Sequence, residues 1–133
     1  MVVRYLTREE IITINKFLAL KYGFKHVVIK PGILDLCVES PMRVVFGYEV
    51  YPNKIEKGAA LMRELNKQHV FLAGNKRTAY LAATTFLELN GYHLSPKNIV
   101  DVSVKTASYV LDTPEIFNWM QGSCKKVSWQ PIE

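Results

Sequence analysis

The segment from residue 76 to residue 90, KRTAYLAATTFLELN, constrains the fold more than any other part of the chain. Its apolar side chains would cover nearly every side of a helix, and Gly91 follows where a glycine commonly ends one. A helix that is apolar nearly all round is normally buried. We therefore expect residues 76–90 to form the central helix of an all-α domain.

Local signals predict further helices on both sides of this segment. Thr7 and Glu10 form a capping box that opens a helix, and Gly23 is placed to end it. Proline suits the first turn of a helix, and asparagine or serine suits the position before it. The other helices are predicted over residues 33–39, 54–68, 95–109 and 113–122, with starts marked by Pro31, Asn53, Ser95-Pro96 and Thr113-Pro114.

Residues 43–51, RVVFGYEVY, differ from the rest because β-branched and aromatic residues surround one glycine. This pattern predicts a short hairpin or an extended flap. Two interpretations are open: the flap docks a target by adding a strand to it, or it is an ordinary buried hairpin. The residues at its centre are Val45, Phe46, Gly47 and Tyr48.

Composition and length predict one domain. The chain has 133 residues, of which 49% are hydrophobic and 22% charged, so there is apolar material for one core. We place this domain at residues 1–122 and expect residues 123–133 to form a loose C-terminal tail. No apolar run reaches the roughly 18–20 residues that span a bilayer, and the first residues lack a signal-peptide pattern. A cytoplasmic protein without a membrane partner is expected.

The distribution of charge and the spacing of the cysteines argue against a nucleic-acid-binding surface and against a cysteine metal site. The formal net charge of +5 could favour nucleic acid, nucleotide phosphates or an acidic protein partner. The cations are spread along the chain without a long basic block, which argues against nucleic acid. Cys37 and Cys124 have neither a CxxC nor a metal-ligand spacing, so both are expected to be free thiols.

Residues 69–79, HVFLAGNKRTA, combine the features of a phosphate-binding loop. The start of a helix presents free backbone N–H groups and the positive end of its dipole. Gly74 permits a tight turn and a close approach of the backbone, and the Asn75 amide can donate to a phosphate. Lys76 and Arg77 add positive charge, and an arginine can grip two phosphate oxygens at once.

His69 stands on the other side of this turn. Its ordinary pKa lies near neutrality, so a histidine there can accept a proton from a substrate hydroxyl. A base beside a phosphate cradle suggests transfer of a phosphate-containing group to that hydroxyl. Taken alone, a histidine before a helix is usually a surface or core residue, so the ordered combination carries the prediction. Phe71 is expected to pack inward and fix the loop.

The ordered motif from His69 to Ala79 resembles the signature of the Fic/Doc superfamily, written HxFx(D/E)GNxR, and its KRTA ending resembles the Doc (death-on-curing) branch. The similarity extends over about residues 5–110. It includes the turn at Lys30-Pro31-Gly32, the flap, residues 56–60, and residues 86–92.

This resemblance implies a compact all-α Fic-fold helical bundle whose β-hairpin flap docks the backbone of a target. It implies an enzyme that modifies a protein hydroxyl with ATP and Mg²⁺. Fic members typically transfer AMP, whereas the Doc branch phosphorylates a threonine of translation elongation factor Tu and arrests translation. Doc proteins are toxins that a small antitoxin, Phd, holds in check.

The resemblance also implies a role for each motif residue. His69 would be the general base. Gly74, Asn75 and Arg77 would bind phosphate. Lys76 would fill the position that is glycine in AMP-transferring members, where a bulky cation narrows the pocket and favours a nucleotide that offers its terminal phosphate.

The chain departs from the family pattern at two positions. The acid that normally holds Mg²⁺ is replaced by Ala73. Three outcomes are open: weak activity, use of another acid such as Glu49 or Glu64, or no activity. Tyr80 replaces a second arginine of the AMP-transferring members. No self-inhibitory pattern is found, which favours a separate antitoxin. Three functions stay open: a Doc-type protein kinase, a Fic-type AMP transferase, and a degenerate non-catalytic binding protein.

Overall fold

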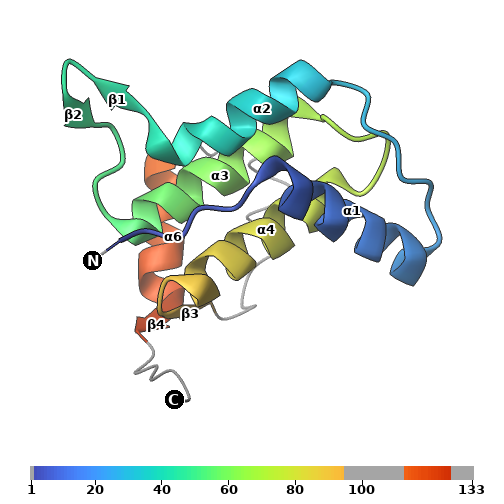
Figure 1. Ribbon diagram of the computed structural model, residues 1–133. Coiled ribbons are helices and arrows are strands. Elements are labelled where there is room, and N and C mark those ends of the chain that lie inside the picture. Colours follow the sequence, from blue (N-terminus) through green and yellow to red (C-terminus); the bar gives the residue numbers. More distant parts are fainter. Residues whose placement is uncertain (1, 95–112, 127–133) are drawn as a thin grey trace, which may run out of the picture.

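The computed structural model describes residues 2–94 and 113–126, which form a helical bundle with two small two-stranded antiparallel sheets (Figure 1). The prediction of an all-α domain with a short flap is confirmed. The helix predicted over residues 95–109 lies outside the described residues. Among the described residues, no helix has the length and apolar character needed to cross a membrane.

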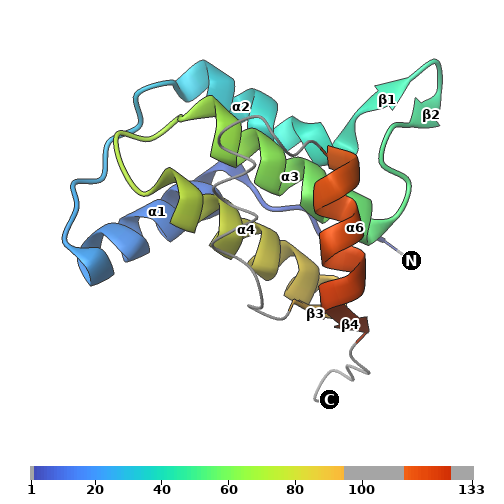
Figure 2. The same ribbon diagram turned by 180° about the vertical axis from the view of Figure 1, so that it is seen from behind.

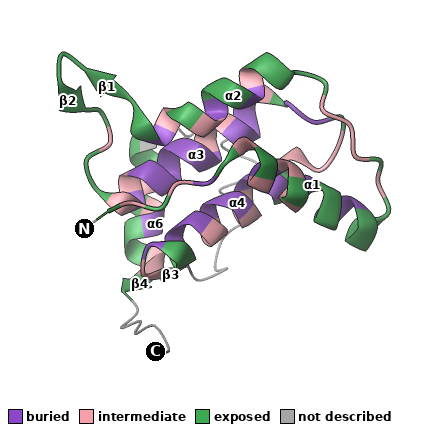
Figure 3. Cartoon of the chain, in the orientation of Figure 1, coloured by how far each residue is buried: buried purple, intermediate pink, exposed green. Residues whose placement is uncertain are grey.

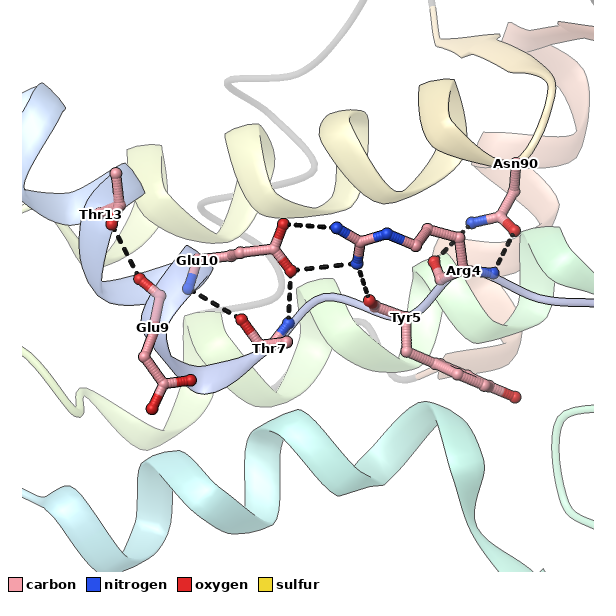
Figure 4. A network of polar contacts seen from close by, with 7 residues as sticks. All are labelled: Arg4, Tyr5, Thr7, Glu9, Glu10, Thr13 and Asn90. Carbon is pink, nitrogen blue, oxygen red and sulfur yellow. Dashed lines mark hydrogen bonds and ion pairs between the residues drawn. The ribbon is translucent and has the colours of Figure 1, made fainter.

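Helix α1, Arg8–Tyr22, begins and ends where the sequence predicts. The backbone N–H of Glu10 donates to Thr7 Oγ1 over 3.2 Å, and the Thr7 N–H donates to the Glu10 carboxylate over 2.8 Å (Figure 4). At the other end, Gly23 is left-handed at φ 76° and its N–H reaches the Ala19 carbonyl. The first helix is therefore set by local capping.

The next helices also follow their local signals. Helix α2, Pro31–Glu39, has its proline in the first turn and runs into the short 3₁₀ helix η1, Ser40–Met42. Helix α3, Lys54–Gln68, is capped by Asn53, whose side-chain oxygen accepts from the Glu56 N–H over 2.7 Å. The remaining described helices are α4, Asn75–Leu89, and α6, Thr113–Ser123.

Helix α3, and not α4, is the central helix of the described part. It packs against α4, α6, α2 and η1, and α6 crosses it in the rear view (Figure 2). Most of its length is buried, whereas α4 exposes residues at both of its ends (Figure 3). The prediction that residues 76–90 form the central helix is thus corrected.

Small side chains explain why α3 has neighbours on several sides. Gly58, Ala59 and Ala60 follow one another in its first half, and all three are buried. A Cβ atom added to Gly58 would lie 3.1 Å from the Leu87 side chain, so α4 approaches the α3 backbone closely at this point. The close approach buries Phe86 and Leu87 of α4 completely.

Strands β1, Val44–Val45, and β2, Tyr48–Glu49, form the predicted flap. Val45 pairs with Tyr48 across a two-residue turn, and Phe46 and Gly47 both have positive φ, which is typical of tight hairpins. All four strand residues are exposed, and Phe46 at the tip is 96% exposed. The interpretation as a buried hairpin is therefore wrong, and the flap projects from one end of the bundle (Figure 1).

Residues 123–126 are more ordered than expected. Strand β3, Tyr92–Leu94, pairs with strand β4, Cys124–Lys126, so that Leu94 lies opposite Cys124. The predicted loose tail from residue 123 therefore does not hold for residues 123–126, because α6 extends to Ser123 and backbone pairing with β3 orders the next three. Both cysteines are free thiols, and burial raises the pKa of Cys37 to about 12 and that of Cys124 to about 11.

Candidate functional site

The motif forms the loop that connects α3 to α4, at the end of α3 opposite the flap (Figures 1 and 2). His69 ends α3 in a left-handed conformation, with φ 50° and ψ 52°, and its side chain is exposed. Gly74 precedes α4 and is also left-handed, with φ 75°. The two ends of one short loop therefore hold the candidate base and the start of the candidate phosphate-binding helix.

Phe71 anchors the middle of the loop. Its side chain is 1% exposed and lies in the core, where the sequence predicts it. The Asn75 side chain clamps its backbone: the Phe71 N–H donates to Asn75 Oδ1 over 3.1 Å, and Asn75 Nδ2 donates to the Phe71 carbonyl over 2.8 Å. The side chain of Asn75 thus closes the loop. The sequence suggested only a contact with phosphate for this residue, and not this second role.

Gly74 is required by a contact as well as by its backbone conformation. A Cβ atom at this position would lie 2.3 Å from the ring of Phe24, which follows α1. Real Cβ contacts are longer than this, so any side chain at residue 74 would require the Phe24 ring to shift. Phe24 therefore covers the turn, and its importance could not be seen from the motif alone.

Lys76 and Arg77 lie in the first turn of α4 and are both exposed. Positive side chains are mildly unfavourable at this end of a helix, where the dipole is already positive. The guanidinium carbon of Arg77 lies 4.0 Å from the centroid of the Tyr22 ring, at the end of α1. The first turn of α4 thus concentrates positive charge where a helix also presents free backbone N–H groups, which suits an anion.

The flap and the motif are not brought together. Helix α3 separates them, and its 15 residues span about 22 Å at the usual rise per residue. A cavity of about 1060 Å³ lies between the flap base, α2, α3 and α6, and it reaches Glu64, five residues before His69. Residues of the flap base, Met42, Arg43, Val50 and Tyr51, line this cavity, and no motif residue is among the described residues that line it.

The base of the flap is tied to α3 by a buried lysine. Lys57 is 1% exposed, and its ammonium donates to Glu49 over 2.9 Å and to the Pro41 carbonyl over 3.2 Å. Burial opposes its charged form, but the interactions with Glu49 and Tyr5 outweigh burial and raise the pKa of Lys57. Strand β2 is therefore held to the bundle by a charged contact.

The described residues do not fit a Mg²⁺ ion at the motif. Ala73 has no ligand atom in its side chain, and no group of three or more His, Cys, Asp or Glu side chains gathers anywhere in the described part of the chain. Glu49 is paired with Lys57, and Glu64 contacts Arg63 and Gln68. Both alternative acids predicted from the sequence thus already have partners from the protein.

Comparison with known proteins defines the class of this chain. A model of the Fic/DOC family matches residues 5–87, which include the flap, α3 and the motif. The chain therefore belongs to the Fic/DOC family. It is 39% identical over 97 residues to a protein named Toxin Doc from Mycolicibacterium smegmatis (strain ATCC 700084 / mc(2)155), a match that covers 73% of this chain and 72% of that protein.

Proposed function

We propose that this chain is a Doc-type toxin of a toxin–antitoxin pair, which transfers the terminal phosphate of ATP to a hydroxyl group of a protein. The observation that carries the proposal is the loop from His69 to Arg77. An exposed histidine stands at one end of it, and two cations stand at the start of α4 at the other. Family membership and the similarity to Toxin Doc support the same conclusion.

The proposed reaction uses groups that the loop supplies. The start of α4, with Gly74, Lys76 and Arg77, would bind the phosphates of ATP. His69 would take the proton of the target hydroxyl while the hydroxyl oxygen forms a bond to the terminal phosphorus. The bond between that phosphorus and the bridging oxygen then breaks, and ADP leaves with the electron pair.

The proposed target is a threonine of translation elongation factor Tu, whose phosphorylation would arrest translation. A Phd-like antitoxin would hold the toxin in check, and both partners would meet it in the cytoplasm. The exposed flap supports docking of a protein target, because its strand residues offer backbone groups to another chain. The target would have to extend from the flap to His69, along a distance comparable to the length of α3.

Intact-mass spectrometry of elongation factor Tu, incubated with this chain and ATP with and without Mg²⁺, tests the proposal. A phosphoryl mass increase that is absent with His69→Ala is the expected result. An adenylyl increase would instead place the chain with the AMP-transferring members, against which Lys76 and Tyr80 argue. An increase that persists with His69→Ala would show that the general-base assignment is wrong.

A second function has one observation in its favour. Ala73 cannot bind a metal, and metal ions normally neutralise phosphate charge during transfer, so the chain could bind ATP or a partner without catalysis. Binding of ATP by the wild-type chain without any mass increase on the target would support this function. Appearance of the mass increase with Ala73→Asp would show that the metal site alone had been lost.

A further inference from the structure

Asn15 connects α1 to the motif through a buried side chain. It is fully buried, and its Nδ2 donates to the Ala73 carbonyl over 3.1 Å and to Thr78 Oγ1 over 2.9 Å. Its Oδ1 lies 2.6 Å from His26 Nδ1. One asparagine thus contacts the residue before Gly74, the first turn of α4 and the segment after α1.

These contacts fix how the amide of Asn15 is oriented. Nδ2 faces a carbonyl and a hydroxyl that can accept, so Oδ1 faces His26 and accepts from its Nδ1–H. Burial lowers the pKa of His26, and the charge of Lys16 adds to this effect, so the neutral imidazole is favoured. The Asn15 amide therefore uses both of its N–H groups on the motif side.

The hydrogen bond from Asn15 to the Ala73 carbonyl fixes the orientation of the peptide bond between residues 73 and 74, which precedes α4. A trans peptide is planar, with its carbonyl and its N–H on opposite sides. The Ala73 carbonyl points toward the buried Asn15, so the N–H of Gly74 in the same peptide points away from Asn15. Holding the carbonyl in place therefore sets the direction of a backbone donor in the proposed phosphate site.

We propose that Asn15 is a positioning residue for phosphate binding, which acts through the Ala73 carbonyl and Thr78 to orient the peptide bond between residues 73 and 74 and the first turn of α4. The inference rests on the proposed function, because it assigns Asn15 to the nucleotide site of that function. The competing interpretation is that Asn15 only attaches α1 to the core.

The other end of α4 offers a matched control. Asn90 is 6% exposed, and among the described residues its side chain makes three hydrogen bonds: it accepts from the Arg4 N–H over 2.9 Å and donates to the carbonyls of Arg4 and Phe86 over 2.9 and 2.7 Å. Its contacts with the N-terminal segment are drawn in Figure 4. Buried asparagines thus hold both ends of α4, but Asn90 lies at the end away from the motif.

The experiment compares Asn15→Ala with Asn90→Ala. Both variants should unfold at lower urea concentration, since each loses hydrogen bonds of a buried asparagine. Asn15→Ala alone should weaken ATP binding and lower kcat, on the order of tenfold to a hundredfold, because small displacements in such sites have effects of this size. It alone should also speed hydrogen exchange of the loop amides that are hydrogen-bonded, those of Phe71, Leu72 and Thr78. Equal effects of the two variants on binding and exchange would overturn the proposal.

A second pair of variants decides the matter if Asn15→Ala does not fold. Thr78→Ser keeps the hydroxyl that accepts from Asn15, whereas Thr78→Val keeps the shape and removes the acceptor. We expect Thr78→Ser to retain ATP binding and slow exchange, and Thr78→Val to lose part of both. Identical behaviour of these two variants would contradict the proposal.

The same measurements separate this inference from the proposed function. Hydrogen exchange is measured without nucleotide or target, so it reports the order of the loop even if the wild-type chain transfers no phosphate. A selective loss of order with Asn15→Ala, in a chain that binds ATP but leaves its target unmodified, would refute the kinase function and support the positioning role. Phosphoryl transfer that is equally fast in Asn15→Ala and wild type would refute the positioning role alone.

Discussion

The guanidinium of Arg77 stacks on the ring of Tyr22, with 4.0 Å between the guanidinium carbon and the ring centroid. The last residue of α1 therefore supports the second cation of the motif. Stacking uses the flat face of the guanidinium and leaves the N–H groups at its edge available for phosphate oxygens. Tyr22 thus restricts the motion of Arg77 without occupying its donors.

Replacement of Tyr22 by alanine should weaken ATP binding by about two- to fivefold, the equivalent of about 0.5–1 kcal/mol for an exposed cation–π contact. Calorimetric titration with ATP measures the difference. Tyr22→Phe keeps the ring and should bind ATP like wild type. A Tyr22→Phe variant that binds as weakly as Tyr22→Ala would show that the hydroxyl, and not the ring, matters.

Gly74→Ala should be much more destabilising than Gly23→Ala, although both glycines have nearly the same φ, 75° and 76°. A Cβ at Gly23 meets nothing within 4 Å, so only the left-handed conformation contributes, about 1–2 kcal/mol. At Gly74 the added atom would also collide with Phe24 at 2.3 Å. Urea unfolding of both variants isolates the cost of this collision.

The double variant Gly74→Ala with Phe24→Ala provides the control for the collision. Removing the ring should recover part of the stability that Gly74→Ala loses, relative to Phe24→Ala alone. The two changes would then be non-additive, as expected for residues in contact. Strict additivity would mean that the Phe24 ring moves aside without cost.

Helix boundaries could be predicted from the sequence because capping is local. Thr7 and Glu10 lie three positions apart, as do Asn53 and Glu56, and each pair is bonded as its spacing suggests. The contacts that shape the motif are not local: Asn15 and Ala73 are 58 positions apart. No local sequence pattern links positions that are so far apart. The motif residues could therefore be predicted from the sequence, but the residues that hold them in place could not.

The central helix was predicted incorrectly for a related reason. Apolar content favours α4, but the packing depends on where small residues allow a close approach, as at Gly58 of α3. Lys57, next to it, is buried in the structure, although lysine is seldom fully buried unless it is paired. Burial of a lysine depends on a partner from the flap, Glu49, which the helix pattern cannot supply.

Substitutions at the two ends of the ion pair between Lys57 and Glu49 should lower the free energy of unfolding by different amounts. Glu49→Ala leaves a buried ammonium without its carboxylate and should cost about 1–3 kcal/mol, because an unpaired buried charge is unfavourable. Lys57→Met should cost less, since the carboxylate left behind is 51% exposed and stays hydrated. Free energies of unfolding in urea test the order. A larger loss with Lys57→Met would mean that the flap base depends on the Pro41 contact instead.

The stability of the protein should be sensitive to acid because of Glu10, the carboxylate of the capping box. The hydrogen bond from Arg4 is the main cause that lowers the pKa of Glu10 from 4.5 to about 2, and Thr7 adds to it (Figure 4). Between these two values the unfolded chain binds more protons than the folded one, so the free energy of unfolding falls as pH falls. The stabilisation that the Glu10 carboxylate contributes is present above pH 4.5 and is lost as the pH falls toward 2.

Glu10→Gln should therefore reduce the loss of stability between pH 4.5 and pH 2, measured by urea unfolding at several pH values. Glu9→Gln is the matched control, because it removes the same charge from the same turn of α1 at an exposed position. Glu9→Gln should follow the wild-type pH dependence more closely than Glu10→Gln does. The reverse order would place the acid sensitivity outside the Arg4–Glu10 pair.

Ala73→Asp should give the motif the carboxylate that its family pattern contains, without disturbing the loop. Asn15 contacts the backbone carbonyl of residue 73, and the Ala73 side chain is only partly buried, so a carboxylate there can stay hydrated. A negative charge before α4 also suits the helix dipole and should leave stability unchanged or raise it by about 0.3–1 kcal/mol. With Mg²⁺ present, phosphoryl transfer should rise relative to wild type, while Ala73→Asn, which has the same shape without the charge, should show a smaller gain. A variant that is stable and binds Mg²⁺ but transfers no more phosphate would show that the missing acid does not limit this chain.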